Sequence, residues 1–144
     1  MPIVVWSPET RRHASTTEVW VGKPIAGDEL PERVDVILAA LRDARFPIRE
    51  ATTHDDRVLQ RVHDAGLLQH LATVHEEWMC SEIPGLVGQD RVVPYVFATE
   101  AMLGGLPSHA ATAVHARAGR YAYDTMTSVG PGTWEATAQA GRRQ

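Results

Sequence analysis

A continuous apolar run at the start of the chain constrains its fold more than any other feature. The run Ile3-Val4-Val5-Trp6 is rich in β-branched residues, does not alternate with polar residues, and ends at Ser7-Pro8. Such a run is typical of a strand buried on both faces, as strands of parallel sheets are. The sequence therefore predicts that residues 3–6 form the first strand of a parallel sheet.

A helix and a second extended segment follow this strand. The residues after Pro31 show apolar positions at helical spacing, and a proline suits the first turn of a helix. These apolar residues are Val34, Ile37, Leu38 and Leu41. Residues 46–52 are then expected to form a short strand or extended segment. A strand-helix-strand order favours an α/β fold with parallel strands and flanking helices.

Two further helices are predicted in the middle of the chain. Thr53 and Asp56 resemble a capping arrangement before the first of them, and the second is expected to end near Cys80. The apolar side of the first is formed by Val58, Leu59 and Val62, and that of the second by Leu67, Leu71, Val74 and Trp78. Each set lies on one side of a helix, so each predicts an amphipathic element that packs on a core.

Two long loops are expected between these elements. Residues 9–30 are polar and contain Gly22, Pro24 and Gly27 as breakers, while residues 81–120 contain eight glycines and prolines around a brief strand-like run at 92–97. A loop after a strand often faces a ligand. Loops as long as the second are usually functional, partner-bound or disordered.

Near the end of the chain, Gly130-Pro131-Gly132 predicts the start of a helix. Pro131 suits the first turn, while Thr133 and Glu135 supply a capping oxygen and a favourable charge. The glycine spacing differs from that of a phosphate-binding loop, so a turn is favoured over an anion cradle. We expect one domain over residues 1–140 and a tail at 141–144.

Composition excludes several classes of function. The chain has 144 residues, 44% of them hydrophobic, which suits a single soluble domain. A net charge of -4 without basic clusters argues against a nucleic-acid partner. The single cysteine, Cys80, allows no internal disulfide and favours a cytoplasmic location. The sequence shows no signal peptide and no membrane-spanning run, so no membrane partner is expected.

Seven histidines raise the possibility of a metal site, but their spacing does not support one. The fragment beginning His75-Glu76 would need a second histidine where Met79 stands. His63 and His70 could share one face of a helix, yet no third ligand accompanies them. Cys80 lacks a neighbouring base and is expected to be idle rather than nucleophilic. From the residues alone we assign no catalytic and no metal-binding residue.

Several motifs together resemble a known family. The run Asp124-Thr125-Met126-Thr127, followed by the segment 130–136, is similar to a segment that precedes the catalytic core of histone-deacetylase-like proteins, especially the acetylpolyamine amidohydrolases. Further similarity lies in Trp6-Ser7-Pro8 and in the segments 17–22, 30–34 and 62–68. The order and spacing of these motifs carry the resemblance, which covers residues 3–138.

The resemblance implies the N-terminal part of an open parallel sheet of the arginase/deacetylase kind, left incomplete. In its complete form such an enzyme uses zinc to hydrolyse the acetyl-amine bond of acetylpolyamines or acetyl-lysine. The family's zinc ligands and catalytic groups lie beyond the matching segment. We therefore expect a truncated, zinc-free member that has no deacetylase activity alone, and exposed apolar edges that favour aggregation or association.

The same resemblance implies candidate residues at the substrate entrance. Glu18, in the setting Thr17-Glu18-Val19-Trp20, corresponds to a glutamate that attracts a cationic polyamine, and Trp20 would face the same channel. Asp124 matches an aspartate on the rim that holds the substrate. The alternative is a non-catalytic binding or dimerisation module that pairs with a full-length homologue, or a homo-oligomer, through residues 81–120.

Overall fold

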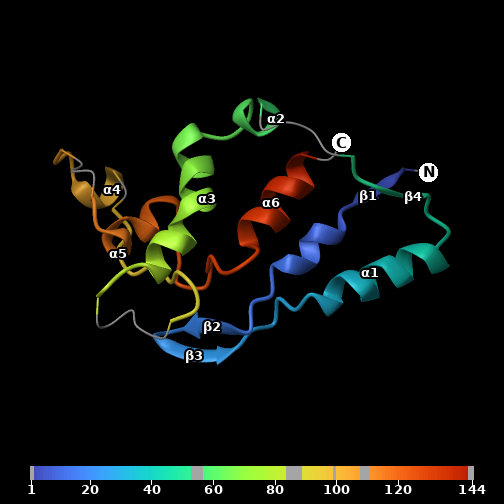
Figure 1. The fold of residues 1–144 in the computed structure, drawn as a ribbon, viewed down its shortest axis with the longest axis horizontal. Helices are drawn as coiled ribbons and strands as arrows, with labels where there is room; N and C mark the ends of the chain where they lie inside the picture. Colours follow the sequence, from blue (N-terminus) through green and yellow to red (C-terminus); the bar gives the residue numbers. More distant parts are fainter. Residues whose placement is uncertain (1, 53–56, 84–88, 99, 108–110, 143–144) are drawn as a thin grey trace.

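The computed structural model describes residues 2–52, 57–83, 89–98, 100–107 and 111–142. Figure 1 shows a long helix, α1, and the paired strands β1 and β4 on one side, and the helices α3, α4 and α5 on the other. Helix α6 lies between these two groups. A small hairpin, β2–β3, lies below them in this view. No helix of the described ranges is long and apolar enough to cross a membrane.

The expected α/β fold with parallel strands is confirmed. Strand β1 (Val4–Trp6) pairs in parallel with β4 (Ile48–Glu50), in the register Val4 to Ile48. Helix α1 (Glu32–Asp43) lies between them in the chain and begins directly after Pro31, which takes the capping position. Strand β1, helix α1 and strand β4 thus form the strand-helix-strand unit that the sequence predicts.

The prediction that the first strand is buried on both faces is wrong for the described residues. The side chain of Val5 is 53% exposed, and on α1 Ile37 is equally exposed while Leu38 is buried. The physical reason is that β1 has one hydrogen-bonded partner, β4, in a two-stranded sheet. Its other edge and one face are therefore open, and an apolar groove of about 310 Å³ runs between β1 and α1.

The expected loop over residues 9–30 is also wrong, because this segment contains a short helix and a hairpin. The 3₁₀ helix η1 (Pro8–Arg12) follows β1, and β2 (Thr17–Trp20) pairs antiparallel with β3 (Lys23–Ala26). Val21 and Gly22 make the two-residue turn with φ of 48° and 75°. Two positive φ angles define the turn whose twist matches a tight hairpin. A β-branched residue rarely adopts this conformation, so Val21 carries no signal for a hairpin.

The helices in the middle of the chain match the prediction in part. The capping pair Thr53 and Asp56 lies outside the described residues. Helix α2 (Arg57–Gln60) is a single turn that ends before Val62, whose side chain is 76% exposed. Helix α3 (Ala65–Met79) confirms the second of the two predicted helices and ends before Cys80 as expected. Its N-terminus is capped by the Asp64 carboxylate, which accepts a hydrogen bond from the N–H of Leu67 at 3.1 Å.

The expected long loop from 81 to 120 is partly helical, which corrects the sequence-based description. It contains the one-turn helices α4 (Glu100–Leu103) and α5 (Val114–Arg117) and leads into the 3₁₀ helix η3 (Ala118–Tyr121). The strand-like run is reduced to one antiparallel bridge, between Val92 and Val129. These segments pack on α3 to form the core cluster of Val74, Trp78, Val92, Val114, Ala118 and Val129.

The expected helix start near the end of the chain is confirmed, with a small shift. Helix α6 (Thr133–Arg142) begins after Pro131 rather than with it in the first turn. Gly132 adopts φ of +78° and lies against the backbone of Arg12, so that a methyl group on its Cα would be 2.4 Å from the Arg12 carbonyl oxygen. This close approach fixes α6 beside η1, as Figure 1 shows. Helix α6 includes the first two residues of the segment expected to be a tail.

Candidate functional site

Glu18 is a buried carboxylate on strand β2. Its side chain is 8% exposed, although the sequence suggested a solvated loop carboxylate or one at a channel mouth. The backbone N–H of Asp28 donates a hydrogen bond to Glu18 Oε1 at 3.2 Å. Strand pairing fixes the backbone of Glu18, and this hydrogen bond fixes its carboxylate group. The carboxylate is therefore preorganised before any ligand arrives.

Glu18 lines a cavity of about 590 Å³ that is rich in carboxylates, and we call it the acidic cavity. Asp28 and Glu29 from the segment after the hairpin line it too, as do His13 and Thr133. The His13 Nδ1 and the Thr133 Oγ1 lie 2.8 Å apart and form a hydrogen bond, which ties η1 to the start of α6. Glu29 also pairs with Arg33, so Glu18 and Asp28 are the carboxylates that leave negative charge for a cation at this cavity.

Arg91 supports this site from behind, and the sequence analysis did not identify it. Its side chain is 6% exposed, and its guanidinium donates hydrogen bonds to Ser15 Oγ at 3.0 Å and to Thr16 Oγ1 at 3.2 Å. Asp90 pairs with it at 3.2 Å. Arg91 thus holds the segment that enters β2 and presents Glu18. A lone arginine before an apolar run carries no sequence signal for this role, because its partners are more than 70 residues away.

Trp20 and Asp124, the other two entrance candidates, occupy different positions. Trp20 ends β2 and its side chain is 56% exposed. Asp124 is exposed and its Oδ1 accepts hydrogen bonds from the N–H groups of Met126 and Thr127, at 2.9 and 2.7 Å. The hydrogen bonds from Thr127 lower the pKa of Asp124, because they stabilise its charged form. Asp124 therefore shapes the 124–127 turn, and it is Met126 and Thr127 from this turn that line the acidic cavity.

The same turn is tied directly to β2. The Thr125 hydroxyl donates a hydrogen bond to the backbone carbonyl of Val19 at 3.0 Å. Val19 lies between Glu18 and Trp20, so the turn and the two entrance candidates of β2 form one connected unit. The motif at 124–127 and the motif at 17–22, which are far apart in sequence, meet here.

The histidines and the cysteine show no metal site within the part of the chain that the structure describes, where no group of three His, Cys, Asp or Glu side chains could hold an ion. His63 lies before α3, whereas His70 is on it, so the two do not share a helix face. His75 Nε2 is hydrogen-bonded to the Asp90 carbonyl at 3.0 Å. Cys80 is a free, exposed thiol. The zinc ion that the family resemblance implies therefore finds no fitting ligand set among the described residues.

The fold and the site together define an α/β protein with a carboxylate-lined cavity, and comparisons with known proteins extend this description. No protein-family model matches the chain. It is 28% identical over 134 residues to an acetylpolyamine amidohydrolase of Mycoplana ramosa, and 30% identical over 134 residues to one of Burkholderia pseudomallei. These matches cover 92% and 93% of this chain but 37% and 36% of the relatives.

A solved structure gives the same result. The crystal structure of acetylpolyamine aminohydrolase from Burkholderia pseudomallei matches 96% of this chain with a TM-score of 0.80 and 27% sequence identity. The matched region is 38% of that chain. The present chain is therefore a partial homologue of the acetylpolyamine amidohydrolases, and it spans little more than a third of their length.

Proposed function

We propose that these residues form the substrate entrance of an amidohydrolase that acts on acetylated amines, with acetylpolyamines as the preferred class. The observation that carries the proposal is the acidic cavity, where Glu18, Asp28 and Glu29 gather around one space. A polyamine with one acetylated end keeps a protonated amine at neutral pH, as lysine does. Clustered carboxylates raise the local concentration of such a cation and pair with it directly.

Each entrance candidate has a distinct role in this proposal. Glu18, held by the Asp28 N–H, pairs with the ammonium group of the substrate. The exposed Trp20 offers an aromatic face on which a second cationic or methylene segment can lie. Asp124 keeps the 124–127 turn in place on the cavity wall through its hydrogen bonds to Thr127. Arg91 positions the segment before β2 without contacting the substrate.

Hydrolysis of the acetyl-amine bond is proposed for the complete form of the enzyme and not for these 144 residues alone. The zinc of the family would be held by residues outside the described ones, because no fitting ligand set lies among them. We derive no chemical step from this chain. What its residues supply is recognition of the cationic end of the substrate.

The recognition role is tested by calorimetric titration of the 144-residue chain with N-acetylputrescine and with N-butylacetamide, a neutral ligand of similar length. The cationic ligand is expected to bind about fivefold more tightly, as one partly exposed charge pair provides. Glu18→Gln keeps the acceptor for the Asp28 N–H but removes the charge, so it should reduce the preference, with Asp28 left at the cavity. Glu76→Gln, an exposed change on α3, is the matched control and should retain it. Equal binding of both ligands by the unmodified chain would contradict the proposal.

The assignment of hydrolysis to the complete form has its own test. The purified chain is incubated with N-acetylputrescine or an acetyl-lysine peptide, with and without added zinc, and acetate is measured. We expect no acetate above the blank. Zinc-dependent release of acetate by the chain would show that the catalytic groups lie within these 144 residues.

A second candidate, a non-catalytic binding or dimerisation module, is supported by the surface of the 81–120 segment. Tyr95, Val96 and Leu106 are between 50% and 71% exposed there, and exposed apolar side chains that gather on one surface favour association. A tagged chain is mixed with a complete acetylpolyamine amidohydrolase, and capture is measured with Leu106→Glu as the control. Specific capture that this substitution removes would favour the module, whereas cation-selective ligand binding without capture favours the entrance.

A further inference from the structure

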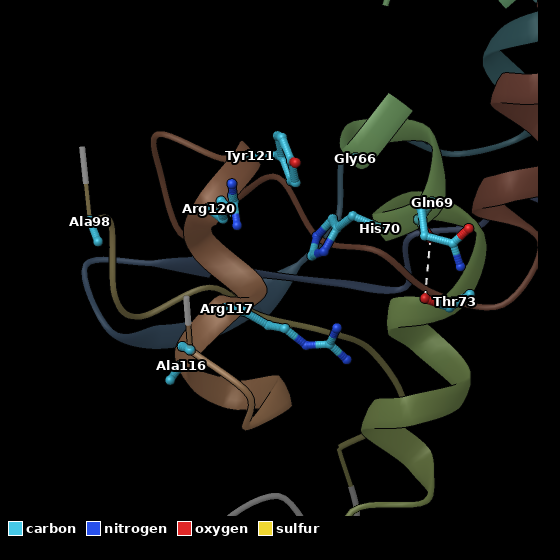
Figure 2. Close-up of a pocket in the computed structure, with 10 residues that line it drawn as sticks. Gly66, Gln69, His70, Thr73, Ala98, Ala116, Arg117, Arg120 and Tyr121 are labelled. Atoms are coloured by element: carbon cyan, nitrogen blue, oxygen red, sulfur yellow. Dashed lines mark hydrogen bonds between the residues drawn. The ribbon is translucent and has the colours of Figure 1, made fainter. Parts of the chain in front are cut away.

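A second cavity, which we call the basic cavity, shares no lining residue with the acidic one among the described residues. It occupies about 270 Å³ between the first half of α3 and the segment formed by α5 and η3. Figure 2 shows His70 pointing from α3 toward Arg120 and Tyr121, with Arg117 extending below it toward α3. The polar residues that line the cavity are Gln69, His70, Thr73, Arg117, Arg120 and Tyr121. Among the described residues that line it there is no carboxylate.

Two arginines supply the charge of this cavity. Arg117 pairs through Nη2 with Glu77, but its Nε is buried and has no hydrogen-bond partner among the described residues. Arg120 is exposed and its guanidinium lies 5.6 Å from the centre of the Tyr121 ring. Within the described ranges Arg120 takes part in no ion pair. Each arginine therefore retains donors that a ligand could use.

Two acidic groups lie close to these arginines. Asp64 Oδ1 accepts hydrogen bonds from the Tyr121 hydroxyl at 3.2 Å and from the N–H of Leu67, so this carboxylate places a negative charge at the mouth of the cavity. Glu77 is engaged with Arg117. Burial, and then the charges of Arg117 and Arg120, lower the pKa of His70. The neutral imidazole is therefore favoured, first by burial and then by the two arginines.

We propose that this cavity binds a small oxyanion, with a phosphate group as its preferred ligand. Arg117 approaches from α5 and Arg120 from η3, and the His70 imidazole approaches from α3. Planar guanidinium groups match the geometry of phosphate oxygens, and charge-assisted hydrogen bonds of this kind are the strong ones. Within the described residues Arg117 pairs with Glu77 and Arg120 has no ion pair, so Arg120 supplies the positive charge and Arg117 adds a hydrogen-bond donor for an oxyanion. The proposal does not depend on the function proposed for the acidic cavity.

The proposal is tested by titrating the 144-residue chain with inorganic phosphate at fixed pH and ionic strength, while the His70 imidazole signals are followed by NMR. His70→Gln assigns these signals. A saturable change with a Kd of about 1 mM is expected. Arg120→Gln breaks no ion pair of the described fold and should weaken binding about tenfold, as the loss of one charge-assisted hydrogen bond predicts. Arg42→Gln, in the last turn of α1, removes the same charge elsewhere and should leave binding unchanged.

Parallel titrations separate the possible anions. Phenyl phosphate tests whether a phosphate monoester enters, succinate tests a carboxylate, and chloride at matched ionic strength tests bulk screening. Binding of inorganic phosphate or phenyl phosphate in preference to succinate supports the proposal. Equal responses to phosphate and chloride, or equal phosphate affinities for the unmodified chain and Arg120→Gln, would overturn it.

Discussion

The contact between η1 and α6 leads to a prediction that can be worked out from two glycines. Gly132 and Gly22 adopt nearly the same left-handed conformation, with φ of +78° and +75°. A methyl group at Gly132 would be 2.4 Å from the Arg12 carbonyl oxygen, whereas one at Gly22 would meet no atom within 4 Å. The two substitutions to alanine thus differ in one respect, the steric contact with η1.

The expected magnitudes follow from this comparison. Gly22→Ala places alanine in a left-handed backbone conformation, which lowers the free energy of unfolding by about 1 kcal/mol. Gly132→Ala has the same backbone strain and also displaces the backbone of Arg12, and such overpacking lowers the free energy of unfolding by about 1–3 kcal/mol. We therefore expect a total loss of about 2–4 kcal/mol at Gly132. The excess over Gly22→Ala measures how firmly η1 is held against α6.

The assay is urea unfolding followed by far-UV circular dichroism, at two protein concentrations so that association would be detected. With a slope of about 1.5 kcal/mol per molar urea, the midpoint should fall by about 0.7 M for Gly22→Ala and by about 2 M for Gly132→Ala. Equal shifts for the two variants would refute the reasoning, since they would show that the η1–α6 contact gives way at no cost.

Three other changes have defined outcomes. Arg91→Met removes the hydrogen-bond donors to Ser15 and Thr16, so the opening free energy of the β2–β3 hairpin should fall by about 1–2 kcal/mol. The amide hydrogens of the hairpin should then exchange faster. The pKa of Asp124 is lower in the folded chain than in the unfolded chain, so its charged form stabilises the fold at neutral pH, and this stabilisation is lost as the pH falls through the folded pKa. Asp124→Ala should therefore lower the free energy of unfolding by a few tenths of a kcal/mol at neutral pH and leave it unchanged in acid, as measured by urea unfolding. Val5→Lys on the open edge of β1 should reduce association of the chain, measured as the mass in light scattering. An unchanged mass would contradict the expectation that this edge drives association.

The strand-helix-strand unit and α3 could be predicted because they depend on local periodicity. Val74 and Trp78 lie in the predicted stripe of α3, and each is 1% exposed. The burial of the first strand could not be predicted in the same way, because it depends on what lies beside Val5. An apolar run specifies a strand but does not specify how many neighbours that strand has.

The hairpin and the support of Glu18 were missed for a different reason. Val21 adopts a conformation that β-branched residues avoid, so the turn carries no residue signal beyond Gly22. Arg91 reaches Ser15 across 76 positions of sequence, and no local pattern reports such a contact. The family resemblance supplied Glu18 as a candidate, whereas the gathering of Asp28 and Glu29 around the same cavity became visible only in the fold.

The hydrogen bonds around the acidic cavity also bear on how the chain is made. Ser15, Val19 and His13 are held by side chains that lie 76, 106 and 120 positions later. At a synthesis rate of about 5–20 residues per second, residues 13–26 would emerge from the ribosome roughly 5–25 s before Thr133, the partner of His13, is available. During that interval the hairpin lacks the partners that hold it, because contacts of large sequence separation form late. Substitutions at Arg91, Thr125 or Thr133 should therefore lower the yield of folded protein in cells more than their equilibrium cost suggests.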